Sequence, residues 1–355
     1  MLQNGTPESR SHAPGNLPLR AGFVPASGQF TRLWSQPGTR ALIALMFVLG
    51  LGCIFNAHGA FFKIGTHRDA LRQASVFGIL ACGLTLVIIS GGIDLAVGSV
   101  LALVAVAWSL MSLHWGWSAW LSIPLCLLLG SACGATTGTL TARVGIQPFI
   151  ASLAMMVFAR GLSKTISGGM KVSTIVKGAD GTYHSSDLPQ IYRFLDSRIL
   201  GGNVAVVTVI FLFCAFVAWL VLARHVWGRY LYAVGANEEA ARLTGLPVRA
   251  TKILAYAICG FLAAVAGLCQ AAQEQQGDPE TGIGYELTAI AIVVIGGTNL
   301  SGGGGGLGLT LLGTLTIGYL EKILSLNAVT EASRLMLTGA IIILAVFAQR
   351  RRHLR

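Results

Sequence analysis

Long apolar runs dominate the sequence from Arg40 onward, and each is close to the roughly 20 residues that an α-helix needs to cross a bilayer. Only 11% of the residues are charged, whereas a soluble domain has about 25%. The sequence therefore predicts an all-α polytopic membrane protein with about ten transmembrane helices, some of them broken or re-entrant. The predicted spans are 41–62, 74–90, 97–113, 118–139, 148–166, 203–223, 252–272, 285–298, 305–320 and 334–349. The eighth is short and ends in glycines, so it is predicted to be a half-helix or a re-entrant segment.

The formal net charge of +11 does not indicate a nucleic-acid partner, because the basic residues lie at the ends of the apolar runs. When the spans are followed in order, the densest basic clusters, 224–252 and 350–355, fall on one side of the membrane. Most acidic residues fall on the other side. Because short basic clusters face the cytosol, both termini are predicted to be cytosolic.

Three polar regions lie outside the predicted spans. Residues 1–39 hold half of the 10 prolines and predict a disordered cytosolic tail. The transmembrane domain covers 40–350, with an outer insert at 168–202 and a cytosolic loop at 224–251, and 351–355 form a basic cytosolic tail. A long insert can dock a partner outside the cell or serve only as a connection, and both interpretations stay open.

The sequence lacks the motifs of the common hydrolases. It has no Gly-Lys pair, which excludes a Walker A phosphate loop, and neither H-E-x-x-H nor G-x-S-x-G occurs. The histidines are scattered, and the seven cysteines lie in apolar runs without a C-x-x-C pair, as expected of packing residues. We therefore expect no catalytic residue, no metal site and no cofactor bound by this chain.

A charged break interrupts the apolar sequence at residues 91–99. Gly91 and Gly92 free the backbone from helical geometry, and Asp94 can accept hydrogen bonds from the first N–H groups of a helix beginning at Leu95. One interpretation is a tight turn between helices with Asp94 as its cap. The other is a broken helix in a transport pathway, where a carboxylate lies inside the membrane.

A second segment repeats the pattern of this break. Aligning Gly91 and Gly92 with Gly296 and Gly297 sets Asp94 against Asn299 and Gly98 against Gly303. Paired, glycine-broken segments in two halves of a chain point to a transport pathway, although two glycine-rich stretches can also match by coincidence. Because Asn299 is neutral, we interpret Asp94 as a structural residue at the gate rather than as a sugar or proton ligand.

The cytosolic loop 224–251 predicts a short helix of its own. Asn237 is a good N-cap, Glu238 and Glu239 suit the first turn, and Gly245 with Pro247 ends the run. The helix is expected to be about 10 Å long. It either lies on the membrane surface or forms a rigid knob presented to a cytosolic motor.

Three motifs together resemble the membrane permease subunits of ribose-type sugar ATP-binding-cassette importers, in the branched-chain amino acid/ribose permease superfamily. The first is Gly-Gly-Ile-Asp-Leu-Ala-Val-Gly-Ser at 91–99. The second is Gly-Arg-Tyr-x-Tyr-Ala-Val-Gly-x-Asn-Glu-Glu-Ala-Ala-Arg-Leu-x-Gly at 228–245, and the third is Gly-Tyr-Glu-Leu at 284–287 leading into Val-Ile-Gly-Gly-Thr at 294–298. The resemblance covers about residues 70–350.

The resemblance implies a permease of the bacterial cytoplasmic (inner) membrane that works as a pair, homodimer or heterodimer. A separate cytosolic ATPase would bind ATP and Mg, and an extracytoplasmic binding protein would deliver the sugar. The E-A-A-x-x-x-G core of importer permeases matches residues 239–245, so the implied coupling residues are Asn237, Glu238, Glu239, Ala240, Ala241, Arg242 and Gly245. The implied gate residues are Gly91, Gly92, Asp94, Gly98, Gly296, Gly297, Asn299 and Gly303.

The sequence departs from the family pattern in three places: no Ile-x-Leu-Pro follows the 239–245 core, the 168–202 insert is long, and 270–280 is rich in Gln and acid. The resemblance leaves the particular sugar or polyol open. Two other classes of transporter stay open as well. An ion-coupled secondary transporter would rely on Asp94 and Glu286, and a related permease would carry branched-chain amino acids or nucleosides.

Overall fold

The structure is a computed structural model that describes residues 36–177, 182–185 and 187–350. The basic tail predicted at 351–355 lies outside these residues, as does the predicted N-terminal tail before residue 36. The first described helix begins at Pro37, within the last residues assigned to that tail.

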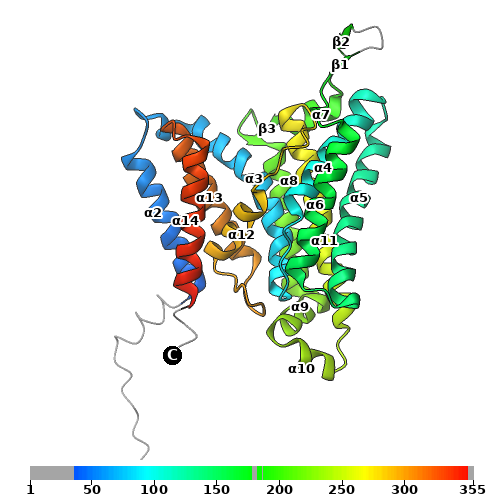
Figure 1. Cartoon of the computed structure of the whole chain (residues 1–355). Helices are drawn as coiled ribbons and strands as arrows, with labels where there is room; N and C mark the ends of the chain where they lie inside the picture. The colour runs from blue at the N-terminus through cyan, green and yellow to red at the C-terminus, as the bar shows by residue number, and fades with distance from the viewer. Residues whose placement is uncertain (1–35, 178–181, 186, 351–355) are drawn as a thin grey trace, which may run out of the picture. The chain divides into compact units, whose positions relative to one another are not determined.

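The described chain is almost entirely helical (Figure 1). The helices are α2 (Pro37–Ile54), α3 (Ile64–Ile89), α4 (Val97–Ser109), α5 (Ala119–Thr139), α6 (Pro148–Ser167), α7 (Gln190–Asp196), α8 (Val206–Arg224), α9 (Val226–Ala236), α10 (Glu238–Leu243), α11 (Val248–Glu274), α12 (Tyr285–Gly296), α13 (Leu307–Leu326) and α14 (Glu331–Arg350). One short turn, η1 (Ala60–Phe62), precedes α3, and π-helical turns η2 (Leu110–His114) and η3 (Leu140–Val144) extend α4 and α5. Two antiparallel pairs join β1 (Ile175–Lys177) to β2 (Tyr183–Ser185) and β3 (Arg198–Ile199) to β4 (Val204–Ala205).

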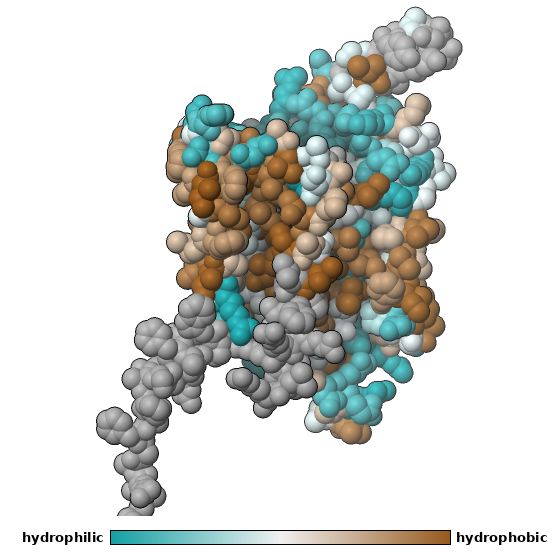
Figure 2. Space-filling model, turned by 60° about the vertical axis from the view of Figure 1, so that its left-hand side comes forward, coloured by the Kyte–Doolittle hydropathy of each residue, from teal (hydrophilic) through white to brown (hydrophobic). Residues whose placement is uncertain are grey.

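Eight of the described helices are long and apolar enough to cross a membrane: α2, α3, α4 with η2, α5 with η3, α6, α8, α11 and α13. In Figure 2 a hydrophobic band lies between two hydrophilic ends. These observations confirm the prediction of an all-α polytopic membrane protein. Helix α12 has 12 residues and is about 18 Å long, too short for a hydrocarbon core of about 30 Å.

The predicted spans differ most from the structure near the N-terminus. Helix α2 ends at Ile54 rather than at 62, and α3 begins at Ile64 rather than at 74. Arg68 and Arg72 therefore lie in the first turns of α3 and not in a loop. The hydrophobic pattern misses these turns because they are polar. In the structure they form ion pairs with the 168–202 insert, Arg72 with Asp196 and Asp69 with Arg198.

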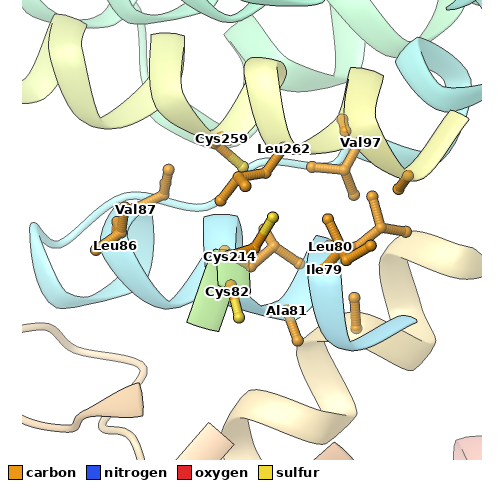
Figure 3. Close-up of a cluster of buried hydrophobic side chains, with 14 of the residues drawn as sticks. Ile79, Leu80, Ala81, Cys82, Leu86, Val87, Val97, Cys214, Cys259 and Leu262 are labelled. Carbon is orange, nitrogen blue, oxygen red and sulfur yellow. The ribbon is translucent and has the colours of Figure 1, made fainter. Parts of the chain in front are cut away.

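Helices α3 and α11 form the centre of the bundle. Helix α11 packs against α3, α4 and α5, and α3 also contacts α8, α12 and α13. Close packing depends on small residues: a Cβ at Gly134 of α5 would overlap the carbonyl oxygen of Tyr256 in α11. Figure 3 shows Cys259 and Leu262 of α11 gathered with Leu80 and Val97 in the buried core.

The two ends of the bundle carry different structures (Figure 1). Helices α9 and α10 lie at one end, called the α10 end below. The described part of residues 168–202, called the insert below, contains β1, β2, α7 and β3 and lies at the opposite end, called the insert end.

Candidate functional site

The first helix break separates α3 from α4. Helix α3 ends at Ile89, Gly91 adopts the left-handed conformation with φ +80°, and helix α4 begins only at Val97. Asp94 Oδ1 accepts a hydrogen bond from the backbone N–H of Ala96 at 2.9 Å. The prediction that a helix begins at Leu95 with Asp94 as its cap is therefore wrong, because the carboxylate closes a turn before the helix.

The residues of this break pack against the middle of α11. Asp94 is 3% exposed and hydrogen-bonds the Cys259 side chain. The Tyr256 hydroxyl donates to the carbonyl oxygen of Ile93 at 3.0 Å, which satisfies a backbone group that no helix can pair. A Cβ at Gly92 would lie 2.6 Å from the same hydroxyl, so a side chain there would displace Tyr256.

The second break follows the short helix α12 and repeats the turn of the first. Asn299 Oδ1 accepts a hydrogen bond from the N–H of Ser301 at 3.1 Å, two residues on, as Asp94 does from Ala96. The two side chains that the sequence sets against each other thus close the same kind of turn. The left-handed glycines differ by one position in the alignment. Gly91 aligns with Gly296, but the left-handed residue at the second break is Gly297, which directly follows α12 with φ +104°.

The two breaks meet each other and the end of α9. The N–H of Gly303 donates to the carbonyl oxygen of Ile89 at 3.0 Å. A Cβ at Gly235 of α9 would overlap that same oxygen, and a Cβ at Gly302 would lie 3.0 Å from the backbone nitrogen of Gly91. We call Gly91, Gly235, Gly302 and Gly303 the glycine junction. A Cβ at Gly235, Gly302 or Gly303 would come within 3 Å of a neighbouring backbone atom, whereas Gly91 favours glycine through its φ of +80°.

Helix α10 follows the glycine junction directly and has the predicted ends. Asn237 Oδ1 accepts from the N–H of Ala240 at 2.9 Å and caps the first turn. Gly245 has φ +79°, and the N–H groups of Gly245 and Leu246 donate to the carbonyls of Arg242 and Ala241. This pair of hydrogen bonds is a Schellman motif, and it fixes the C-terminus of a helix of six residues.

The charged residues of α10 divide into an anchoring and an exposed set. Glu238 pairs with Lys252 of α11 at 2.5 Å, where the lysine side chain is only 11% exposed. Glu239 pairs with Arg242 within the helix, and both side chains are about two-thirds exposed. Leu243 is 81% exposed. Helix α10 is therefore fixed to the bundle on one face and presents an acid, a base and an apolar residue on the other.

The N-termini of α4 and α12 approach each other inside the bundle. A Cβ at Gly98 of α4 would overlap the carbonyl oxygen of Gly282 and lie 2.6 Å from a carboxylate oxygen of Glu286. Such paired helix starts provide backbone N–H groups and positive dipole ends at one place in the interior. Gly98 therefore lies in this close approach and outside the glycine junction, although its aligned partner Gly303 belongs to that junction.

Arg160 of α6 is a site residue that sequence reasoning missed. Its Nη1 donates to the carbonyl oxygens of Thr281, at 2.7 Å, and Pro279, and so ties down the loop before α12. It also interacts electrostatically with Glu286. A lone arginine in an apolar span is an available signal, because such residues are costly in a membrane and are usually paired.

Within the described residues, no group of three or more His, Cys, Asp or Glu side chains could hold a metal ion. Their cysteines are free; Cys53 is exposed and the others are buried packing residues.

Comparison with known proteins shows which family the chain resembles. The model of a family described as branched-chain amino acid transport system / permease component matches residues 68–346. The ribose import permease protein RbsC of Escherichia coli (strain K12) is 38% identical over 324 residues, which cover 91% of this chain and 96% of that protein. The fructose import permease protein FruF of Bifidobacterium longum is 36% identical over 280 residues (78% and 75%). The autoinducer 2 import system permease protein LsrD of Yersinia enterocolitica is 30% identical over 315 residues (88% and 92%). No solved structure matches the chain.

Proposed function

The chain belongs to the branched-chain amino acid transport system / permease component family, and we propose that it forms the translocation pathway of an importer for ribose or a related monosaccharide or polyol. Its similarity to ribose, fructose and autoinducer 2 import permeases supports a sugar-like substrate. The observation that carries the proposal is the glycine junction, where both helix breaks touch the helix that leads into α10.

In this proposal the chain is a transport subunit and not an enzyme. A separate cytosolic ATPase binds ATP and Mg and docks on α10, whose exposed Glu239, Arg242 and Leu243 form a small surface of mixed charge and apolar character. Because only Asn237 separates α9 from α10, and Ala241 of α10 packs with Val234 of α9, a displacement of α10 carries α9 with it. Gly235 then passes the displacement to both helix breaks.

The α10 end faces the cytosol in this proposal, and the insert end faces outward. The chain lies in a bacterial cytoplasmic membrane with both termini inside. A second permease subunit completes the pathway, and an extracytoplasmic binding protein brings the sugar to the insert end. Asp94, buried and engaged with Ala96 and Cys259, shapes the first break and does not bind sugar.

The test is uptake by the reconstituted protein. The chain is placed in proteoliposomes with a candidate importer ATPase and a candidate sugar-binding protein, and entry of radiolabelled ribose is measured with and without ATP. We expect uptake that requires ATP and both partners, with unlabelled pentoses and polyols competing according to the specificity of the binding protein. Uptake driven by a proton or sodium gradient in vesicles that lack the ATPase would instead establish a secondary transporter.

A further inference from the structure

The insert places one aromatic side chain deep in the bundle. Tyr192 of α7 is fully buried, and its ring stacks on Trp108 of α4 with centroids 4.0 Å apart and planes within 2°. Its hydroxyl lies 3.0 Å from Ser109 Oγ and 3.1 Å from Ser112 Oγ. Burial raises the pKa of Tyr192 to about 12, so the hydroxyl stays protonated. The insert is therefore attached to the outer half of α4 by ring stacking and by hydrogen bonds.

A second contact joins the insert to the loop before α12. Val172 and Gly277 exchange two backbone hydrogen bonds, each 2.8 Å long. A Cβ at Gly277 would lie 2.6 Å from the carbonyl oxygen of Ala105 in α4, so this loop is pressed against α4 where the insert holds it. Lys171 and Asp278 add an ion pair at 3.0 Å.

A third set of contacts joins the insert to α3. Asp196 pairs with Arg72, and Arg198 pairs with Asp69 at 2.5 Å. The insert thus contacts the helix that enters the first break, the helix that leaves it, and the loop that leads to the second break. A polar connection whose only role was to join α6 to α8 would not need a tyrosine that is buried against α4.

We propose that Tyr192 is a positioning residue for transport: it fixes the insert to α4, so that a partner docking at the insert end acts on the helix break at 90–96. The idea rests on the proposed function for its partner, the sugar-loaded binding protein. In this proposal the insert links a docked partner to the first helix break at the insert end, as the glycine junction links α10 to both breaks at the α10 end.

The first experiment needs no transport. Amide hydrogen exchange is measured on the full chain in lipid nanodiscs for wild type, Tyr192→Phe and Tyr192→Ala. Tyr192→Phe keeps the stacked ring and loses the hydroxyl contacts, so we expect exchange in 104–112 and in 92–98 to quicken by about two- to tenfold, the range of one hydrogen bond. Tyr192→Ala should show a larger effect. Tyr319→Phe is the matched control, because it removes a hydroxyl that contacts His67 Nδ1 at 3.2 Å and touches neither segment.

The second experiment measures ribose uptake per permease molecule with increasing amounts of loaded binding protein. We expect the maximal rate to fall by about two- to tenfold in Tyr192→Phe and further in Tyr192→Ala, at an unchanged half-saturating concentration. Exchange at 92–98 that stays at the wild-type rate in Tyr192→Ala, or an unchanged maximal rate per molecule, would overturn the inference. If the wild type imports no sugar, the proposed function fails, while the exchange experiment still decides whether Tyr192 positions α4.

Discussion

The backbone N–H of Gly303 donates a 3.0 Å hydrogen bond to the carbonyl oxygen of Ile89, which joins the segments where α3 and α12 end. Gly235 of α9 lies against the same carbonyl and leaves no room for a Cβ. A movement of α9 must therefore move both helix breaks or separate from them. Two segments that are far apart in the sequence share one contact with the helix that leads into α10.

The rest of the α9–α10 region is built to move as one body. Ala241 of α10 packs with Val234 of α9 and Val248 of α11 in a small buried cluster. The capped ends of α10 hold its shape together with these contacts. A short, rigid helix of this kind transmits force better than a flexible loop, because little of the displacement is lost in bending.

Two single substitutions, Asp94→Asn and Asn299→Asp, test whether Asp94 acts through its shape or its charge. Asp94→Asn keeps the Oδ1 acceptor for the N–H of Ala96, so we expect much of the uptake to remain. Asn299→Asp should be more harmful, because Asn299 Nδ2 also donates to the carbonyl oxygen of Gly302 at 3.1 Å and a carboxylate cannot. Uptake per molecule is measured for both variants. Complete loss in Asp94→Asn would indicate a titrating role instead.

A bulky side chain at Gly92 should abolish transport. The Cβ of Gly92→Leu would meet the Tyr256 hydroxyl at 2.6 Å, which would push Tyr256 away from the carbonyl oxygen of Ile93. Gly161→Leu is the control, since a Cβ at Gly161 of α6 has open space around it. Both variants are compared by membrane abundance and uptake. Full activity of Gly92→Leu would count heavily against the role of the first break.

Reversing the charge of Glu239 should uncouple transport and leave the fold intact. Its exposed ion pair with Arg242 contributes at most about 1 kcal/mol to stability. We expect Glu239→Lys to reach the membrane at wild-type levels but to import little sugar, because its charge then opposes the ATPase surface. Basal and sugar-stimulated ATP hydrolysis are measured beside uptake.

A double variant separates docking from helix stability. Glu239→Lys combined with Arg242→Glu restores an ion pair within α10 while the charge at 239 stays reversed. We expect this variant to remain uncoupled. Recovery of uptake would mean that the single substitution had only weakened the helix.

Arg160 should matter more than its neighbour Lys164. Arg160→Met leaves the carbonyl oxygens of Pro279 and Thr281 without their donor, at a cost of about 1–3 kcal/mol. Lys164→Met removes an exposed pair with Glu280 and should change little. Thermal unfolding in detergent and uptake are measured for both. Equal effects of the two substitutions would show that the loop before α12 is held by other contacts.

The local pattern predicted most of the elements on which this account rests. Apolar runs marked the spans, and Asn237 with Gly245 marked both ends of α10, because capping depends on residues within a few positions of each other. The aligned Asp94 and Asn299 predicted paired breaks for the same reason. The predicted span 97–113 begins at the residue where α4 begins, but Asp94 does not cap a helix beginning at Leu95, because its carboxylate accepts from the N–H of Ala96 and either turn satisfies the same local preference.

The arrangement of these elements could not be read from the pattern. The glycine junction joins residues far apart along the chain, and small residues allow close approach without specifying a partner. Tyr192 lies in a polar insert, where nothing local distinguishes a buried tyrosine from an exposed one. The position of Arg160 within an apolar span was a signal of a functional role, but it did not identify the carbonyl groups that Arg160 binds.

The central claim is that the glycine junction couples α10 to both helix breaks, and Gly235→Ala tests it most directly. Gly161→Ala is the matched control, since both residues are in helices and alanine favours a helix by about 1 kcal/mol over glycine in each. Only the Cβ at 235 overlaps the Ile89 carbonyl, and such overpacking typically costs about 1–3 kcal/mol. We expect ATP-driven uptake per molecule to fall by about tenfold or more in Gly235→Ala and to remain at the wild-type level in Gly161→Ala. Equal uptake by the two variants would contradict the account.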